Sequence, residues 1–542
     1  HTKRKNKDGS VVSYLQLAHN IRDGKKGAIR AEVLYNFGRS DQLDVDAIRR
    51  LIKSLTRFLP PEEHSGATSS LDFVSSKPMG GAYLLRKIWE KIGIKAMPNK
   101  SLKEREFSAP VEWAIFAMVA NGALSPDSKV GVEQWVKHDV VLGNDAPISL
   151  HHLYRAMDYL LEEGENLQKE VFFTTADLLN LSVDLLFFDT ASTYVERDEE
   201  DIEGLRRYGY SKDSRPDLPQ VVIGLAVTKE GIPVRCWVLP GNTPDMKTVE
   251  LVKKDLRGWR LSRCVWVMDR GMNSEANRMV LQQGGGHYII GERAGDGSDA
   301  HREVLSHGGR FKKVKDNLEV KEVVAGDGER RRRFIVVYNP LEAVRDAEKR
   351  EETLKRIGEN ISAIKGKKEK SYKKALCLLT GHRTMGRYVM LDSNGTAAIN
   401  EAKVKEDEKY DGKYILSTSD DTLSAEDAAL GYKQHIEVER AFRTLKTTLE
   451  LRPMYHRKDD RISSHILLCF LALLLIRVAE KESGMTWDSI RAVMNRLHLG
   501  EFHCEDSIVF QTTKITSEQA AIFHSLDVPV PPRFTKIKTP PS

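Results

Sequence analysis

The stretch YKQHIEVERAFRTLK, from Tyr432 to Lys446, carries an acid at the edge of an apolar stripe. It contains no glycine or proline, and its apolar residues recur at the spacing of an amphipathic helix. A helix turns about 100° per residue, so several polar residues share one arc beside that stripe. These residues are Tyr432, His435, Glu439, Arg443 and Lys446. Taken alone, this helix is explained by ordinary surface charge. The rest of the chain decides whether its acid is instead part of a functional site.

The composition bounds the class of protein. The chain has 542 residues, 40% of them hydrophobic and 30% charged, which suits several domains with real cores. Its formal net charge of +6 is compatible with nucleic acid without requiring it. Five widely spaced cysteines without a CxxC pair argue against structural zinc and predict a reducing, cytoplasmic compartment. The apolar run 466–476 is too short to span a bilayer, so we expect a buried helix and no membrane partner.

The first third of the chain predicts small modules. Residues 1–60 contain two strand-like runs, Val11–His19 and Ala28–Phe37, and then a helical pattern. Residues 61–80 are rich in Pro, Ser and Gly and predict a linker. Residues 81–180 are helical throughout, with Ser149 as an expected N-cap. Basic side chains on these helices suit DNA, and a helical adaptor with solvated charges explains them equally well.

Two later apolar runs each reach an acid. VDLLFFD ends at Asp189 and RCVWVMD ends at Asp269, and both are typical of buried central strands. A predicted hairpin and a predicted helix lie between them, and a further strand follows. The order fits a mixed α/β sheet that begins with three antiparallel strands. The intervening and following segments are Gln220–Val227, Ile232–Leu239, Asp245–Leu256 and His287–Gly291.

Residues 292–425 change character and predict an inserted, partly β subdomain with basic surfaces. The strand Phe334–Tyr338 is preceded by four arginines, which are candidates for phosphate contacts. The charged helix Ala343–Ile364 is expected to present a solvated face. After the insertion come the opening helix, a buried helix at 464–480, and a tail that we expect to be extended or disordered from Pro529. The four arginines are Arg330, Arg331, Arg332 and Arg333.

Asp189, Asp269 and Glu439 together suggest a metal site. Oxygen ligands on rigid elements suit Mg²⁺ or Mn²⁺. Two such ions between three acids can activate an attacking hydroxyl and stabilise the leaving oxygen. Each aspartate alone is better explained as a strand-end cap or an ion-pair partner, so the prediction depends on all three acids in this order of elements.

That order resembles the ribonuclease H-like core of DDE nucleases. The Tyr432–Lys446 helix resembles Tyr-x2-Arg-x3-Glu-x6-Lys, the signature of DDE transposases of the insertion-sequence-4 type family. FFDTASTYVE and VMDRGM resemble the family's first and second acid segments. YGYSKDSRPDLPQVVIGLAV and ERAFRTLKTTLELRPMYHR also resemble the family, and the likeness runs from about residue 10 to 480. The long gap before Glu439 resembles the β-rich insertion of this branch.

The resemblance implies a multidomain α/β fold with a mainly helical N-terminal region. Residues 1–60 and 81–180 would bind DNA, 181–291 with 426–500 would form the ribonuclease H-like core, 292–425 the insertion and 501–542 a tail. Asp189, Asp269 and Glu439 would be the catalytic, metal-binding acids. Tyr432 and Lys446 would contact DNA phosphates, with Arg443 as a helper. His435 stands where the family has arginine, so it loses a permanent charge.

Some relatives cut through a DNA hairpin and hold a flipped base on an aromatic residue of the insertion. All seven tryptophans of this chain lie outside 292–425. Phe334, Tyr338 or Tyr410 would have to stack the base instead, so the sequence leaves the hairpin route open.

The resemblance predicts a transposase in the bacterial or archaeal cytoplasm, at the nucleoid. It would bind terminal inverted repeats, cleave the transposon ends and transfer the 3′-hydroxyl ends to double-stranded target DNA, as a homodimer in a paired-end complex. One alternative is a domesticated transposase that binds DNA without cutting. The presence of all three acids argues against it. Another is a phosphoryl-aspartate hydrolase, which needs a second Asp two residues after Asp189, where Ala191 stands.

Overall fold

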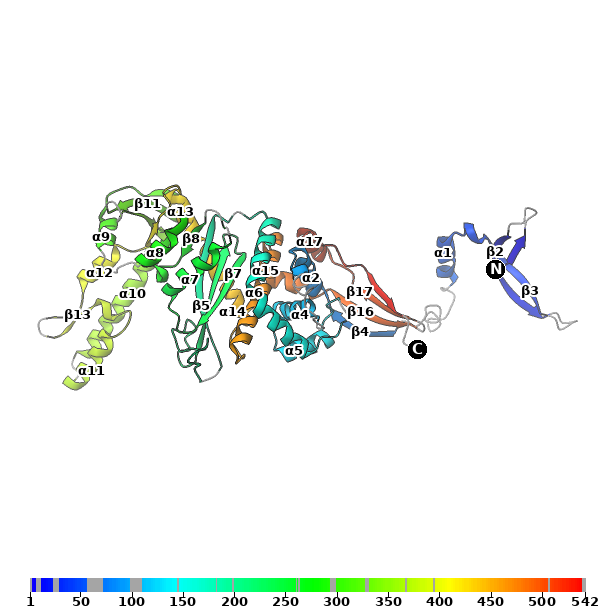
Figure 1. Ribbon diagram of the computed structural model, residues 1–542, viewed down its shortest axis with the longest axis horizontal. Coiled ribbons are helices and arrows are strands. Elements are labelled where there is room, and N and C mark those ends of the chain that lie inside the picture. Colours follow the sequence, from blue (N-terminus) through cyan, green and yellow to red (C-terminus); the bar gives the residue numbers. More distant parts are fainter. Residues whose placement is uncertain are drawn as a thin grey trace. The chain divides into compact units, whose positions relative to one another are not determined.

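The computed structural model separates into two compact units, each described by itself. One comprises His1–Ser76, Gly500–Thr512 and Pro532–Ser542, and the other comprises Lys77–Leu499 and Thr513–Pro531. Figure 1 shows the elements along the chain. The structure describes residues 2–5, 11–22, 29–55, 72–97, 110–143, 146–181, 183–196, 199–259, 261, 264–292, 299–326, 331–365, 368–392, 395–504 and 507–538.

The first unit contains antiparallel strands and one helix. Strands β1 (Thr2–Lys5), β2 (Val11–Arg22) and β3 (Ile29–Arg39) form one sheet and precede α1 (Val45–Leu55). The pattern of residues 1–60 predicts β2, β3 and the helix but not β1. Residues 23–28, between β2 and β3, lie outside the described residues.

A second sheet corrects two expectations, the linker over residues 72–80 and the tail at 501–542, while residues 61–71 of the expected linker lie outside the described residues. Its order is β18-β17-β16-β4, so segments from both ends of the chain pair with each other. Phe73 packs against Phe502 with ring centroids 5.6 Å apart. This pairing is long-range, and a local pattern does not show it. The strands are β4 (Asp72–Pro78), β16 (His498–Cys504), β17 (Ser507–Thr512) and β18 (Phe534–Lys538).

The second unit is built on a mixed sheet of nine strands in the order β10-β11-β12-β15-β9-β8-β5-β6-β7. Strands β5, β8 and β9 are parallel, and β5-β6-β7 is the antiparallel meander that the sequence predicts. The strands are β5 (Leu185–Tyr194), β6 (Gln220–Thr228), β7 (Pro233–Pro240), β8 (Val265–Met268), β9 (His287–Gly291), β10 (Lys312–Lys315), β11 (Leu318–Ala325), β12 (Arg332–Tyr338) and β15 (Lys413–Thr418).

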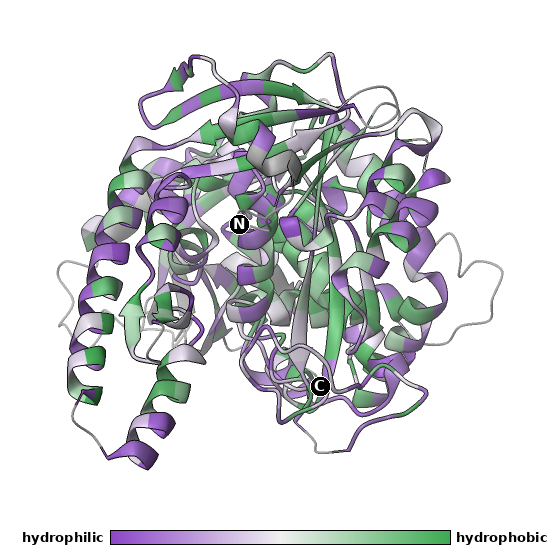
Figure 2. Cartoon of the chain, turned by 90° about the vertical axis from the view of Figure 1, so that its left-hand side faces the viewer, coloured by the Kyte–Doolittle hydropathy of each residue, from purple (hydrophilic) through white to green (hydrophobic). Residues whose placement is uncertain are grey.

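The main strands of the insertion extend this nine-stranded sheet and do not form a separate one. β15 pairs with β9, where Leu416 lies opposite Gly291, and β12, β11 and β10 follow. The pairing covers an edge of β9 that would otherwise present open backbone groups. A small cluster with Ile357 and Leu379 lies under the helical part of the insertion. Figure 2, which views the molecule from this side, shows hydrophilic and hydrophobic residues alternating along its helices. The remaining elements are α9 (Asp299–Ser306), α10 (Pro340–Ile364), α11 (Glu369–Thr380), β13 (Val389–Leu391), β14 (Ala397–Ile399) and α12 (Glu401–Glu408).

Each face of the central strands packs into its own core. Leu186 and Phe188 of β5 join a cluster with α7 (Asp245–Arg257) and α8 (Glu275–Gln282). Phe187 and Ala191 point the other way and join the largest cluster of the protein. This alternation, with period two, decides which face each later side chain of β5 occupies.

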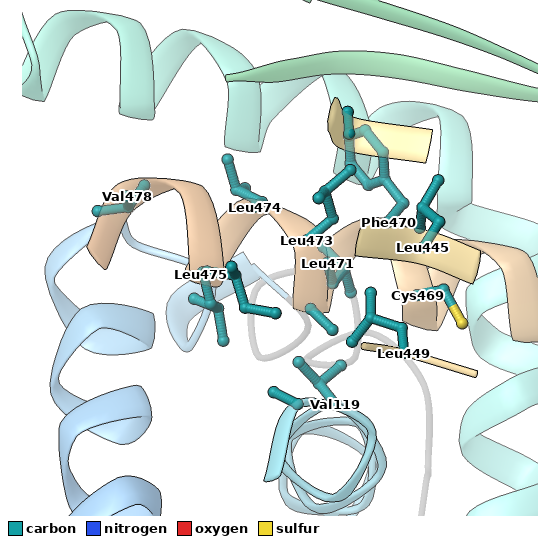
Figure 3. Packing of buried hydrophobic residues seen from close by; sticks show 14 of the residues in the cluster. Val119, Leu445, Leu449, Cys469, Phe470, Leu471, Leu473, Leu474, Leu475 and Val478 are labelled. Atoms are coloured by element: carbon teal, nitrogen blue, oxygen red, sulfur yellow. The ribbon is translucent and has the colours of Figure 1, made fainter. Parts of the chain in front are cut away.

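The predicted buried helix is α15 (Asp459–Ser483), and it joins the helical region to the sheet. It is long and apolar enough to cross a membrane by composition, but 78% of its apolar window is buried inside the protein. It packs against α4 and α6, and Figure 3 shows its Leu471 on the side of the helix that faces Val119 of α4. Residues 81–180 therefore share one core with the sheet, which corrects the separate helical domain. These helices are α2 (Gly80–Lys91), α4 (Val111–Leu124), α5 (Lys129–His138), α6 (Leu150–Leu178), α16 (Trp487–Met494) and α17 (Ser517–Ser525).

Candidate active site

Asp189 and Asp269 lie side by side on neighbouring parallel strands. The β5–β8 ladder ends at the pair Phe188 and Met268, and each acid is the next residue of its chain. Adjacent strands are roughly 4.8 Å apart, and both acids have the parity of the face that carries Phe187. Both are half-buried. The structure therefore brings the first two predicted acids together on one face of the sheet.

The sequence placed Asp189 at the end of its strand, and this is wrong. β5 continues five residues further, to Tyr194, which pairs with Gln220 of β6. The continuation, TASTY, is rich in β-branched and aromatic residues, which favour strands. Asp269 does follow the last residue of β8, as predicted. Asp189 is therefore fixed by strand pairing on both sides of its position.

The surroundings of Asp189 shift the pKa of its carboxyl in opposite directions. Burial raises the pKa of its carboxyl, and the charge of Asp269 raises it further, while the Lys212 ammonium and the nearby His435 ring lower it. The backbone N–H of Thr190 also donates to the Asp189 Oδ1 at 2.7 Å. A half-buried pair of like charges is costly without a cation, so the site favours a positively charged ligand.

Lys212 is a residue of this site to which sequence reasoning gave no role. Its ammonium donates to the Thr190 carbonyl oxygen at 2.6 Å and to the Thr190 Oγ1 at 2.8 Å. It also pairs with Asp245 at 3.3 Å, and the Thr190 hydroxyl donates to the same carboxylate at 2.5 Å. The available signal was the segment YGYSKDSRPDLPQ, which resembles the family but whose position beside Asp189 follows only from folding.

The stretch Tyr432–Lys446 is two helices and not one, which corrects the sequence interpretation. α13 (Ala425–Lys433) ends before Gln434, and α14 (Ile436–Thr447) begins after His435. The break places the Tyr432 hydroxyl 3.5 Å from the Asp269 Oδ1, to which it donates. The Tyr432 ring stacks on His435 with centroids 6.0 Å apart and an interplanar angle of 15°.

Tyr432 and His435 therefore face the acids instead of an open DNA-binding surface. His435 is 7% exposed and packs edge-on against Phe187. Burial, followed by the charge of Asp269, raises the pKa of the Tyr432 hydroxyl, which keeps it a hydrogen-bond donor. The predicted phosphate contacts at these two positions do not fit their burial.

Glu439 is exposed and lies one helical turn after His435 on α14. Residues four apart on a helix share a face, with Cβ atoms about 5–6 Å apart, so Glu439 lies on the same face as His435, whose ring stacks on Tyr432. Within the described ranges, no three His, Cys, Asp or Glu side chains are grouped closely enough to hold a metal as they stand. Glu439, the third predicted acid, therefore does not form a cluster with Asp189 and Asp269 in this structure.

Gly291 makes room for the Tyr432 hydroxyl. A Cβ at this position would lie 2.5 Å from the Tyr432 oxygen and 3.3 Å from the Arg270 backbone nitrogen. We expect Gly291→Ala to lower the free energy of unfolding by about 1–3 kcal/mol, as an overpacked site does, in urea denaturation. Gly258→Ala is the matched control, because nothing lies within 4 Å of its Cβ position. Equal stability of the two variants would show that Tyr432 does not occupy this position.

The arginine run is largely engaged within the protein. Arg333 is 6% exposed, donates to both carboxylate oxygens of Glu322, and gives its third nitrogen to the Asp420 carbonyl oxygen. It has no nitrogen left for a phosphate, which corrects the prediction, because β12 turns this side chain inward. Arg332 pairs with Glu292, whereas Arg331 is exposed and 3.2 Å from Asp421. Arg330 lies outside the described residues.

The other predicted DNA contacts differ in their surroundings. Lys446 is 15% exposed and pairs with Asp213 at 2.8 Å. Arg443 is exposed and lines an open groove of about 680 Å³ beside Arg440. Of the aromatic residues proposed for base stacking, Phe334 is fully buried, which excludes it.

Two family models match parts of this chain. A model of the transposase DDE domain family matches residues 192–475. The matched range includes Asp269 and Glu439 and begins three residues after Asp189. A model of the IS1634 family transposase N-terminal domain matches residues 1–65. The comparison with curated proteins gives no match.

Two solved structures show weak similarity. The cryo-EM structure of a piggyBac transposase synaptic complex with hairpin DNA has 11% identity, covers 76% of this chain and 77% of that chain, and gives a TM-score of 0.32. The Mos1 transposase paired-end complex with left transposon end has 12% identity, coverages of 43% and 69%, and a TM-score of 0.13. The family assignment depends on the match to the family model and not on these structures. Because the DDE domain match extends over more than half of the chain, this protein belongs to the family of DDE-domain transposases.

Proposed function

We propose that the protein cleaves DNA strands at the ends of a mobile element and joins the freed 3′-hydroxyl ends to target DNA. Asp189, Asp269 and Glu439 are its catalytic acids in this proposal. The observation that carries it is the placement of Asp189 and Asp269 on adjacent parallel strands, facing the same side of the sheet. Membership of the DDE transposase family supports double-stranded DNA as the partner.

Asp189 and Asp269 fit a divalent metal. They offer oxygen donors on rigid strands, and their mutual repulsion and burial favour a cation between them. Mg²⁺ or Mn²⁺ ions, two in the family's chemistry, would polarise the attacking oxygen and stabilise the leaving oxygen. Glu439 would complete the ligand set by turning its exposed side chain toward the pair. Tyr432 orients the Asp269 carboxylate, and Lys212 fixes the chain next to Asp189.

The N-terminal residues would recognise the inverted repeats, and the match of residues 1–65 to a transposase N-terminal domain supports this. Arg443, exposed in its groove, is the best placed of the predicted phosphate contacts on α14. Pairing of two ends requires a homodimer in this proposal. The spacing of Tyr432, Glu439 and Lys446 supports the insertion-sequence-4 type branch, and the scattered cysteines support a cytoplasmic location.

A cleavage assay tests this function. Purified protein is mixed with labelled duplex carrying the element's inverted repeats, in Mg²⁺, Mn²⁺ or EDTA. We expect nicking at the repeat boundary that requires metal, and a loss of about 10²-fold in Glu439→Gln, equivalent to about 2.7 kcal/mol in the barrier. Glu437→Gln is the matched control, since Glu437 lies on the same helix but pairs with Arg440 at 2.7 Å. Binding without nicking in either metal would favour the alternative of a DNA-binding protein that no longer cuts.

A further inference from the structure

A pocket lined by none of the acid-pair residues lies against the buried helix α15. It has a volume of about 470 Å³ and is lined by α4, the first turn of α5, α15 and residues 449–456. None of the predicted catalytic or DNA-binding residues lines it. Figure 3 shows two of its lining residues, Cys469 and Leu449, side by side at the margin of the apolar cluster.

Lys129, the first residue of α5, gives the pocket its charge. The side chain is more than nine-tenths buried, since the residue is 8% exposed. Within the part of the chain that the structure describes, its ammonium has no hydrogen bond and no ion pair. Burial lowers its pKa, and the Asp127 carboxylate and the Cys469 thiol oppose this only from a distance. A buried ammonium without a partner is costly and creates a demand for an anion.

Further donors point to the same ligand chemistry. The Asn121 side chain is 1% exposed, and its Nδ2 finds no acceptor among the described residues. The His465 Nδ1 is buried and likewise unsatisfied there. His456 lies against His465 with ring centroids 5.2 Å apart, and burial lowers its pKa to about 4. Both imidazoles are therefore neutral at pH 7, and each can donate one N–H.

The acids at the pocket do not satisfy these donors. The Asp127 carboxylate accepts from the Ser128 backbone N–H at 2.6 Å and lies against Gly131, where a Cβ would come within 2.0 Å of it. The N-cap of α5 is Ser128, whose side chain accepts from the Gly131 backbone N–H. Glu450 is exposed. The ammonium, the amide and the imidazole remain as donors directed at one hollow.

We propose that this pocket binds a phosphate group, with Lys129, Asn121 and His465 as its donors. An oxyanion offers several acceptor oxygens to a set of donors and brings the charge that Lys129 lacks. The volume falls within the range of about 300–1,000 Å³ for small-molecule sites, which is larger than a bare phosphate needs. Tyr455, 75% exposed, supplies an aromatic surface at the same pocket. The ligand is accordingly a phosphate monoester carrying a nucleoside, either a free nucleotide or the 5′-phosphate of a DNA strand.

Calorimetric titration of the full chain tests the proposal with dAMP, deoxyadenosine, and a short single strand with or without a 5′-phosphate. We expect phosphate-dependent binding that weakens at least tenfold in Lys129→Met. Lys137→Met, an exposed lysine of the same helix, is the matched control and should bind like the unchanged protein. A melting curve checks that Lys129→Met is folded, and Asn121→Leu provides a second variant with an intact ammonium.

Each outcome decides the proposal. Binding of dAMP that needs Lys129 supports it with a free nucleotide as the source, and binding of only the phosphorylated strand supports it with DNA as the source. Phosphate binding that is equal in Lys129→Met and Lys137→Met overturns it, as does equal binding of dAMP and deoxyadenosine, or no binding at all. Asp269→Asn should bind the same probes normally, so a failure of the cleavage function leaves this result unaffected.

Discussion

Asp269→Asn is expected to lower the rate of strand cleavage by about 10³-fold or more. The substitution removes one negative charge from the acid pair while keeping the side-chain shape and an oxygen that accepts from the Tyr432 hydroxyl. Loss of charge at a metal ligand costs several kcal/mol in the transition state, and about 4 kcal/mol corresponds to about 10³-fold. The measurement is single-turnover nicking of the labelled repeat duplex in Mg²⁺, with duplex binding measured in parallel. Binding should change little.

The control for this substitution is Asp184→Asn. Asp184 precedes β5 and its side chain is 72% exposed, 3.9 Å from Lys229, so the same change of charge occurs five residues before Asp189 but outside the acid pair. Full cleavage by the control, together with loss in Asp269→Asn, would assign the effect to the pair. Cleavage by Asp269→Asn at more than about a tenth of the normal rate would remove Asp269 from the catalytic acids.

The acid pair was predictable because buried strands have a strong local signal. The apolar runs before Asp189 and Asp269 predict strands, and the meander and helix between them predict a mixed sheet. The end of β5 was not predictable in the same way. Its outer half, with Thr190 and Ser192, is polar in sequence but buried in the fold, because β6 pairs along its whole length.

A break is expected near Gly431, and the structure places it at Gln434 and His435, inside a stretch that contains no glycine or proline. Helical phase counted from Tyr432 therefore placed the tyrosine, the histidine and Glu439 on one continuous surface. In the structure the break turns Tyr432 and His435 toward the acids and leaves Glu439 exposed. Tertiary contacts, such as the close approach of Tyr432 to Gly291, determine the local conformation here.

Partners that are distant in sequence account for the remaining differences. A run of arginines beside a strand is typical of a phosphate-binding surface, but strand alternation turns Arg333 into the protein, where it meets Glu322 and Asp420. Lys446 likewise meets Asp213, 233 residues earlier in the chain. Composition shows that such charges exist, and only the fold shows which of them are already paired.

Asp213→Ala is expected to lower the free energy of unfolding by about 3–5 kcal/mol, the range for breaking a buried ion pair from one side. Asp213 is 3% exposed in its side chain, and Lys446 and Arg452 both reach its Oδ1, at 2.8 and 2.6 Å. Removing it leaves two cations facing each other, although solvent screens part of the charge of Arg452, which places the effect toward the lower end. Urea denaturation measures the change.

Asp217→Ala is the matched control in the same loop, because Asp217 is 59% exposed and pairs with Arg215 at 2.8 Å. Its loss should change the free energy of unfolding little, because solvent screens this exposed pair. Adding Lys446→Met to Asp213→Ala should recover part of the stability, since the two sites are in contact and should couple by about 0.5–3 kcal/mol. Equal stability of the Asp213 and Asp217 variants would contradict the buried ion pair. Because Asp213 follows Lys212 directly, its loss should also slow nicking under conditions where the variant remains folded, by loosening the loop that holds Lys212 beside Asp189.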